Sequence, residues 1–180
     1  RYGIDLYLII NTPPINQDAP VFKVHPEVRG ANQFKPGFCC LCTSNSKVLQ
    51  FMQEAMENLF SKSSKVKGAI FIIGGEGMLH CYSRPVPKTK KGTNCPVCAK
   101  SSPSFVVAGL INSLAKGVKS ARSDAEVIIW PYSAHLWSED KYQRKLIERL
   151  PQDVIFLTSF EKEQILEKEG VRSYIFDYSL

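Results

Sequence analysis

The chain has 180 residues, of which 44% are hydrophobic and 22% are charged, a balance typical of one soluble globular domain or part of one. It contains no apolar run near the roughly 18 to 20 residues that cross a bilayer, and no basic-then-apolar signal pattern appears at Arg1, so we expect no membrane partner. The net charge is +6. Part of this charge comes from a cluster of lysines in one predicted loop: Lys88, Lys90, Lys91 and Lys100. The cluster has no interleaved aromatic residues and no recognisable nucleic-acid-binding motif. We therefore interpret it as a solvated loop and expect no nucleic-acid partner.

The chain opens almost directly into a strand-like segment at Ile4–Ile10 and does not begin with Met. We therefore expect the natural protein to begin upstream. Its localisation stays open between the cytoplasm and export, and its oligomeric state stays open as well.

Short β-branched and aromatic runs alternate with longer segments of helical period. The runs predict strands at Asp5–Ile10, Ala69–Gly74, Glu126–Tyr132, Asp153–Thr158 and Ser173–Asp177. The periodic segments predict helices at Lys47–Phe60, from Ser102-Pro103 onward, at about Glu139–Leu150 and at Glu161–Glu169, with Gly170 as the terminator of the last.

The strands are almost continuously apolar, as in parallel sheets covered on both faces. Helix-to-strand connections are short, whereas the strand-to-helix connections Asn11–Ser46 and Gly75–Ser102 are long. In a parallel α/β structure this places all the elaboration at the carboxyl ends of the strands, where ligands bind.

We therefore predict an α/β fold: a partial parallel (β/α) barrel of the TIM type, with about five strands and four helices. Residues 1–180 form one domain that is truncated at both ends. The alternative is an open, doubly wound sheet that binds nucleotides. Gly74-Gly75-Glu76-Gly77 fits that alternative poorly, because its carboxylate would repel phosphate.

Three acids follow predicted strands and are candidate catalytic groups: Glu76, Glu161 and Asp177. Glycosidic bond cleavage needs one carboxyl group as proton donor and a second group roughly 5 to 9 Å away. Glu76, after two glycines, is our candidate general acid. An ordinary turn or a helix start would also explain each acid.

Aromatic and polar side chains gather at the same predicted strand ends, where sugar rings stack on aromatic planes. The candidate substrate-binding residues are Gly75, His80, Tyr82, Trp130, Tyr132 and Trp137. Core packing alone would account for Trp130, but it accounts less well for Trp137, which we place in a loop.

The six cysteines form two clumps, and Cys95-Pro-Val-Cys98 has the spacing of a zinc knuckle. Cys81 lies on the same connection. We choose Cys42 as the fourth ligand, followed by His80 and then by Cys39 or Cys40. A closed set of four thiolates predicts a structural zinc; a disulfide from Cys95 or Cys81, or free thiols, are the alternatives.

Four segments resemble a group of bacterial barrel proteins related to the hexosaminidase-like and glucuronidase-like glycoside hydrolases. They are Ile72–Gly77, His80-Cys81, Asn94–Cys98 and Trp130–Tyr132. The resemblance implies an eight-stranded (β/α) barrel of which this chain is a central part. In hexosaminidase family 20 an Asp-Glu pair ends the corresponding strand; here Glu76 matches the acid, but Gly75 replaces the Asp.

The leading hypothesis is thus an O-glycoside hydrolase with a carbohydrate substrate and Glu76 as general acid. A non-catalytic carbohydrate-binding barrel is one alternative. A metal-dependent enzyme that uses His80 and the cysteines is another.

Overall fold

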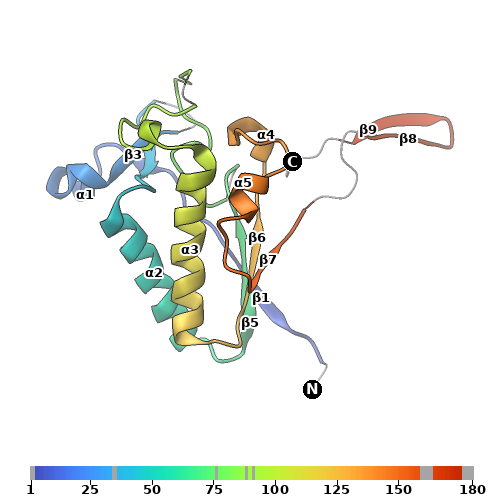
Figure 1. Ribbon diagram of the computed structural model, residues 1–180, viewed down its shortest axis with the longest axis horizontal. Helices are drawn as coiled ribbons and strands as arrows, with labels where there is room; N and C mark the ends of the chain where they lie inside the picture. The colour runs from blue at the N-terminus through green and yellow to red at the C-terminus, as the bar shows by residue number, and fades with distance from the viewer. Residues whose placement is uncertain are drawn as a thin grey trace.

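The computed structural model describes residues 3–33, 36–75, 77–87, 89–90, 92–158 and 164–175. At its centre is a four-stranded sheet in the order β1-β5-β6-β7, whose neighbouring strands are all parallel (Figure 1). The four strands are β1 (Leu6–Ile10), β5 (Val66–Ile72), β6 (Glu126–Trp130) and β7 (Val154–Phe156). Four of the five predicted parallel strands are confirmed, with ends that move by at most three residues.

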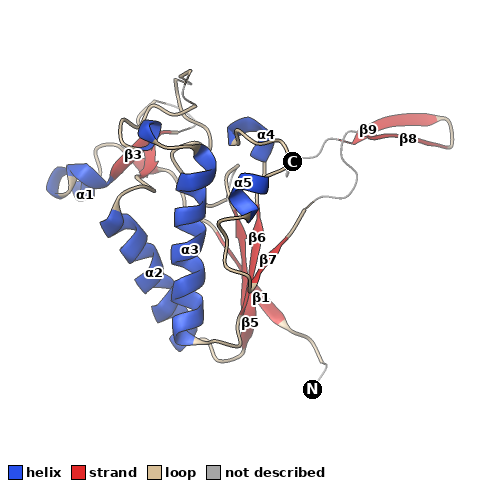
Figure 2. Cartoon of the chain, in the orientation of Figure 1, coloured by secondary structure: helices blue, strands red, loops and turns tan. Residues whose placement is uncertain are grey.

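The two long helices, α2 (Ser46–Ser61) and α3 (Pro103–Ala121), lie side by side on one face of this sheet (Figure 2). Both begin at a capping side chain: Asn45 accepts hydrogen bonds from the N–H groups of Lys47 and Val48, and Ser102 accepts one from Phe105. The predicted Ser-Pro helix start is confirmed. The core between helices and sheet is apolar, and its fully buried members include Phe60, Ala69, Phe71, Leu110, Ile111, Leu114, Val127 and Ile129.

The long connection after β1 carries structure that the sequence pattern did not predict. It holds a small antiparallel sheet in the order β2-β4-β3, together with α1 and the 3-10 helix η1. Their bounds are β2 (Ile15–Asn16), α1 (Pro20–Val24), η1 (Pro26–Val28), β3 (Arg29–Asn32) and β4 (Phe38–Leu41). In Figure 1 this small sheet lies at the end of the molecule where α2 and α3 begin.

The predicted helix at Glu139–Leu150 is much shorter than expected. The structure has only α4 (Ala134–Trp137) and α5 (Arg144–Ile147) between β6 and β7. Ser133 and Gln143, which precede these two helices, both have positive φ angles of 54° and 56°. These left-handed positions interrupt a continuous helix, because consecutive α-helical residues need negative φ.

The C-terminal prediction is wrong in the described part. Gln164–Lys168, expected to be helical, forms strand β8, which pairs antiparallel with β9 (Val171–Ile175). The segment expected to be a fifth parallel strand is therefore half of a hairpin. Glu169 and Gly170 have φ angles of 53° and 77°, as a two-residue type I′ turn requires, so Gly170 closes a hairpin and does not end a helix.

The described residues thus form a mixed α/β fold with one parallel sheet of four strands and small antiparallel additions, and they do not form a closed barrel. Helices cover only one face of the parallel sheet, so the expectation of cover on both faces is also wrong for the described part. None of the helices in the described ranges is long and apolar enough to cross a bilayer.

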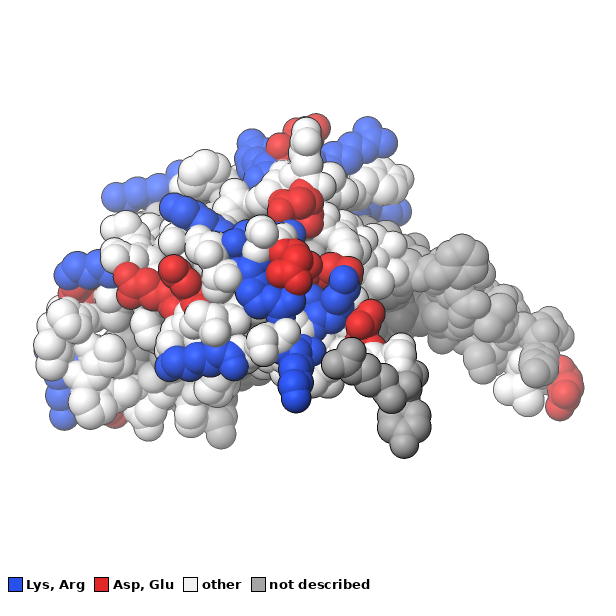
Figure 3. Space-filling view, turned by 90° about the horizontal axis from the view of Figure 1, so that it is seen from below, with Lys and Arg blue, Asp and Glu red and all other residues white. Residues whose placement is uncertain are grey.

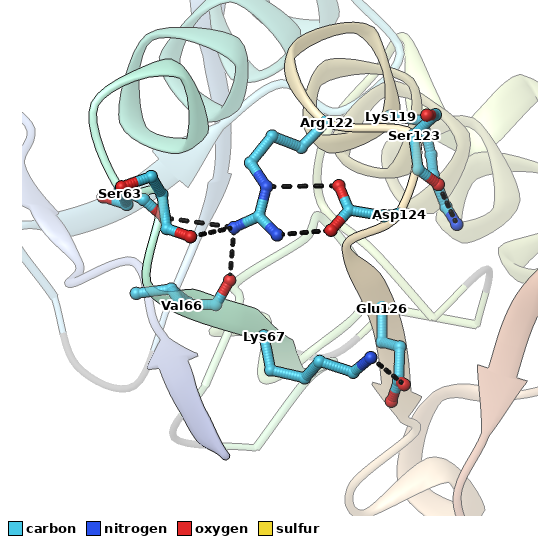
Figure 4. A network of polar contacts seen from close by, with 9 residues as sticks. Ser63, Val66, Lys67, Lys119, Arg122, Ser123, Asp124 and Glu126 are labelled. Atoms are coloured by element: carbon cyan, nitrogen blue, oxygen red, sulfur yellow. Dashed lines mark hydrogen bonds and ion pairs between the residues drawn. The ribbon is translucent and has the colours of Figure 1, made fainter. Parts of the chain in front are cut away.

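Arg122, just after α3, ties together the turns at the amino ends of β5 and β6 (Figure 4). Its guanidinium group donates to the carbonyl oxygens of Ser63, Ser64 and Val66, and it pairs with Asp124 at 2.6 Å. The Arg122 hydrogen bond also holds the pKa of the Asp124 carboxyl below its usual range. Seen from below, this end of the molecule carries interspersed basic and acidic side chains (Figure 3).

We expect Arg122→Met to lower the urea midpoint of unfolding at pH 7, because three turn carbonyls lose a donor. A depressed carboxyl pKa adds stability above the unfolded pKa of about 4, and this stability is lost as the pH falls through the lower folded pKa. The difference in urea midpoint between the variant and the wild type should therefore be smaller at pH 3 than at pH 7. Lys116→Met, which removes an exposed charge of α3, is the control and should change the midpoint little at either pH.

Candidate metal centre

Four buried cysteines from the two long strand-to-helix connections converge on one point. Cys42 follows β4, and Cys81 follows the glycine-rich turn after β5. Cys95 and Cys98 flank the start of the 3-10 helix η2 (Cys98–Lys100). All four sulfur atoms lie within 4.8 Å of one another, and each residue is at most 2% exposed. The predicted set Cys42, Cys81, Cys95 and Cys98 is thus brought together.

The sulfur spacing fits a tetrahedral ion. The Cys42 sulfur lies 3.8 Å from the sulfur of Cys95 and 3.8 Å from that of Cys98. With zinc–sulfur bonds of about 2.3 Å, the edge of a regular tetrahedron of sulfurs is about 3.8 Å. The four thiols therefore have the number, chemistry and spacing that a structural zinc site requires.

Backbone N–H groups already support thiolates at two of these positions. The N–H of Ser44 donates to the Cys42 sulfur, and that of Cys98 donates to the Cys95 sulfur. The pKa values of Cys42 and Cys95 are lowered, foremost by hydrogen bonds from Cys81 and from Cys42, respectively. The pKa values of Cys81 and Cys98 are raised instead, first by hydrogen bonds with Cys40 and Cys42, respectively. Buried thiolates are costly without a compensating cation.

A shell of polar side chains that the sequence analysis missed surrounds the sulfurs. The Thr93 hydroxyl donates to the carbonyl of Cys81 and accepts from the N–H of Cys95. Ser44 Oγ lies 3.2 Å from the Cys98 sulfur. Contacts of this kind, made to the ligands and not to the ion, orient metal ligands. Their positions, a Thr two residues before the knuckle and a Ser two residues after Cys42, are the sequence signals that could have identified them.

Gln33 is a further buried contact that the sequence analysis missed, fully buried beside the loop that carries Cys81. Its side-chain amide donates to the His80 carbonyl at 3.1 Å, and its side-chain oxygen accepts from the N–H of Arg84 at 2.8 Å. It therefore fixes the segment on both sides of Cys81. No local pattern distinguishes it from an ordinary loop glutamine.

The structure contains no disulfide among the six cysteines. Cys40, a lower-ranked ligand candidate, places its sulfur 3.8 Å from that of Cys81, far beyond the about 2.05 Å of a disulfide bond. Cys39 points elsewhere, with its sulfur 3.6 Å from the carbonyl of Ile15. Both residues lie outside the group of four.

His80, the other candidate ligand, also lies outside the group and is a core residue. It is fully buried, it stacks edge-on against Trp137 with ring centroids 4.9 Å apart, and its Nδ1 accepts from the N–H of Tyr82. Burial lowers its pKa to about 3, so the imidazole is neutral. Its Nε2 is buried without a hydrogen-bond partner. The Nε2 nitrogen of the neutral His80 ring is therefore a hydrogen-bond donor without an acceptor, near the carboxyl end of β5.

Tyr82 and Trp137 are buried at 2% and 5% exposure. The Tyr82 hydroxyl lies 2.7 Å from the carbonyls of Cys98 and Ser101, so it fastens the knuckle to the following helix. Burial raises its pKa to about 12. Trp137 donates to the carbonyl of Tyr132. Sugar binding by these two residues stays a prediction that their contacts do not favour.

Trp130 and Tyr132, at the end of β6, are the half-buried aromatic pair of the site. Their rings are 5.3 Å apart in an edge-on arrangement. The Gly74-Gly75 turn at the end of β5 packs against Tyr132: a Cβ on Gly75 would lie 2.4 Å from the Tyr132 ring. Both glycines have positive φ, so this close approach of two strand ends requires glycine.

The three candidate catalytic acids, Glu76, Glu161 and Asp177, lie outside the described residues. So do Lys88 and Lys91 of the basic cluster. Searches with the sequence find no match among protein-family models and none among curated proteins. The metal centre and the aromatic strand ends are therefore the features on which a function can be argued.

Proposed function

We propose that the protein binds one structural Zn²⁺ ion through Cys42, Cys81, Cys95 and Cys98, and that this ion ties its two long connections together at the carboxyl ends of the parallel strands. The observation that supports this proposal most strongly is the convergence of four buried sulfur atoms. The first and last of these cysteines, Cys42 and Cys98, are more than 50 residues apart in the sequence. The Thr93 hydroxyl adds support, because it bonds the backbone of both Cys81 and Cys95 and so fixes two of the four ligands.

A structural role fits better than a catalytic one. Four thiolates complete the coordination of zinc and leave no position for water or substrate. The sulfurs are also buried, so a substrate has no path to the ion. The zinc would instead hold the loops that frame Trp130, Tyr132 and the Gly74-Gly75 turn.

Metal analysis of the full chain, purified without added chelator, tests this function. We expect about one zinc per chain, and Cys42→Ser should reduce the zinc content several-fold. Cys39→Ser is the matched control, because Cys39 is equally buried in the neighbouring strand but lies outside the group. Protein free of metal under these conditions, or equal losses from both variants, would refute the zinc site.

As a second function, we propose that the protein is a partial (β/α) barrel that hydrolyses O-glycosidic bonds, with Glu76 as general acid. Two observations support this. The parallel strands follow one another in sequence order with α2 and α3 on one face, as in a singly wound barrel. The half-buried Trp130–Tyr132 pair lies at the strand ends, where a sugar ring would stack.

Turnover of a panel of aryl glycosides by the full chain, before and after Glu76→Gln, tests the hydrolase. We expect a loss of about 100-fold or more, since that is the scale of general acid catalysis. Glu57→Gln on the exposed side of α2 is the control and should leave turnover unchanged. The second carboxylate is then sought with Asp177→Asn and Glu161→Gln. It is the residue whose substitution causes a comparable loss of turnover.

The alternatives give different results in the same panel. Sugar binding without turnover, abolished by Tyr132→Ala and kept by Glu76→Gln, would indicate a non-catalytic carbohydrate-binding protein. Turnover lost on chelation while the fold is retained would indicate a metal-dependent enzyme and would contradict the structural role of zinc. Turnover unchanged in Glu76→Gln would remove the general acid.

A further inference from the structure

Cys40 is a fifth thiol that touches the candidate metal centre without belonging to it. Its sulfur lies 3.8 Å from the sulfur of Cys81, yet it stands outside the group of four ligands. The neighbouring thiol of Cys39 is directed to the carbonyl oxygen of Ile15 instead. All six cysteines lie in the described ranges, so Cys40 is the thiol that contacts a proposed zinc ligand and is not itself held by the ion.

The side chain of Gln33 holds Cys40 and the loop of Cys81 together. Its amide nitrogen donates to the Cys40 sulfur at 3.6 Å and to the carbonyl oxygen of His80, the residue before Cys81, at 3.1 Å. Gly30 of β3 packs on the other partner, since a Cβ there would lie 2.8 Å from the Cys81 sulfur. Gln33 is fully buried, so these contacts keep the two sulfurs next to each other.

Cys40 also lines a hollow that leads to the surface. This hollow has a volume of about 270 Å³ and lies between the end of β1 and α2. Its wall includes Phe51, which is 57% exposed, whereas Cys40 is only 2% exposed. A water molecule takes up about 30 Å³ in the liquid, so the hollow has room for several molecules of that size. The Cys40 thiol is therefore accessible to a very small reagent and shielded from a large one.

The walls of this hollow are rich in sulfur. All three methionines of the chain, Met52, Met56 and Met78, line it together with Cys40. Peroxides oxidise thioethers to sulfoxides and thiols to sulfenic acids. The methionines thus provide an internal record of whether a peroxide has entered the hollow.

We propose that Cys40 makes the metal centre a redox switch: hydrogen peroxide oxidises Cys40, and Cys81 then leaves the zinc to form a disulfide with it. This inference rests on the proposed structural zinc and adds a means of releasing it. The oxidant enters through the hollow and meets Cys40, which is free of metal, before it meets any of the four ligands.

The two steps balance with one molecule of peroxide. In the first, the Cys40 sulfur attacks one peroxide oxygen, the O–O bond breaks, and the thiol proton leaves with the other oxygen as water. The Gln33 amide stabilises the charge that develops on this sulfur. In the second, the Cys81 thiolate attacks the sulfur of the sulfenic acid, the S–S bond forms, and the departing hydroxide takes a proton from solvent. The two sulfurs are oxidised and the peroxide is reduced to two waters.

The disulfide leaves the zinc with three thiolates, from Cys42, Cys95 and Cys98. A zinc ion with three protein ligands has an open fourth position, which water or a chelator can occupy. The ion is therefore held more weakly and can be removed. A dithiol reductant that cleaves the disulfide returns Cys81 to the site, so the switch is reversible.

Zinc release from the full chain to a colorimetric chelator, with and without hydrogen peroxide, tests the switch after the resting zinc content has been measured. We expect release to accompany a Cys40–Cys81 disulfide in peptide mass spectra, and a dithiol reductant with added zinc to restore the site. Oxidised glutathione, which is too bulky for the hollow, should release little zinc.

Cys40→Ser should hold zinc at rest and release it about 10-fold or more slowly under peroxide, because the remaining thiols are buried and bound to metal. Cys39→Ser is the matched control, since Cys39 is equally buried but faces away, and it should respond as wild type. Equal rates of release in the two variants would overturn the switch. So would equal release by oxidised glutathione and peroxide.

Disulfide mapping of the wild type needs no variant, so it decides the question even where Cys40→Ser fails to fold. Sulfoxide at Met52, Met56 or Met78 without a Cys40–Cys81 disulfide would show that peroxide enters the hollow and leaves the pair unchanged, which overturns the switch. Retention of zinc with no sulfur of the hollow oxidised overturns it as well. These results leave the zinc function intact, whereas a resting chain without zinc refutes the zinc site and the switch together.

Discussion

Removing the zinc should unfold most of the two long connections that carry the cysteines. It should also lower the thermal midpoint of unfolding by more than about 10 °C. Structural zinc sites contribute on the order of 10 kcal/mol to the folded state, and for a chain of this size about 1 kcal/mol shifts the midpoint by roughly 2–4 °C. Here the four ligands join the connection before α2 to the connection before α3, so their release separates both from the sheet. Differential scanning calorimetry with and without a strong chelator measures the effect.

Acid should have the same effect as the chelator. Thiolate ligands must lose their protons to bind metal, so protons compete with zinc and affinity falls as the pH is lowered. We therefore expect zinc release and the drop in midpoint to occur together during an acid titration, and readdition of zinc at neutral pH to reverse both. Cys42→Ser should start at the low midpoint and show neither the response to chelator nor the zinc-linked drop in the acid titration, whereas Cys39→Ser should behave as wild type. A midpoint that is insensitive to chelator in wild type would rule out a stabilising ion.

The sequence was a good guide wherever local pattern and burial agree. The helical period of Lys47–Phe60 and the Ser-Pro start of the next helix led to α2 and α3 within a residue or two, because each has a capping side chain and one apolar stripe. The cysteine spacing led to the four ligands, including Cys42, because the two long connections were correctly placed at the same strand ends.

The sequence was a poor guide where long-range pairing decides the conformation. The short strands β2, β3 and β4 have no alternating pattern of their own and form only because they pair across a long connection. Gln164–Lys168 was mistaken for a helix because Gly170 suits a helix end as well as a hairpin turn. His80 illustrates the same problem at the site, since a buried core histidine and a metal ligand look alike in sequence.

Two glycines on α3 should respond in opposite ways to the same substitution. At Gly117 the two helices touch: a Cβ there would lie 2.1 Å from the carbonyl oxygen of Gln53 and 2.9 Å from Met56 Cβ. Neither backbone nor a buried neighbour yields to such a clash, so α2 and α3 must separate. We expect Gly117→Ala to destabilise the protein by about 1–3 kcal/mol, the usual cost of overpacking a core.

Gly109 occupies the same helix two turns earlier, and a Cβ there would meet only the Leu49 side chain at an ordinary 3.9 Å. Gly109→Ala should therefore stabilise the protein by up to about 1 kcal/mol, because alanine favours the helix by that amount over glycine. Urea unfolding of both variants measures the pair. Since helix propensity changes equally in the two, the difference between them reports the contact between α2 and α3 alone. Equal changes in the free energy of unfolding would mean that α2 and α3 do not pack together at Gly117. The helix packing that places both cysteine connections at one end of the sheet would then be contradicted.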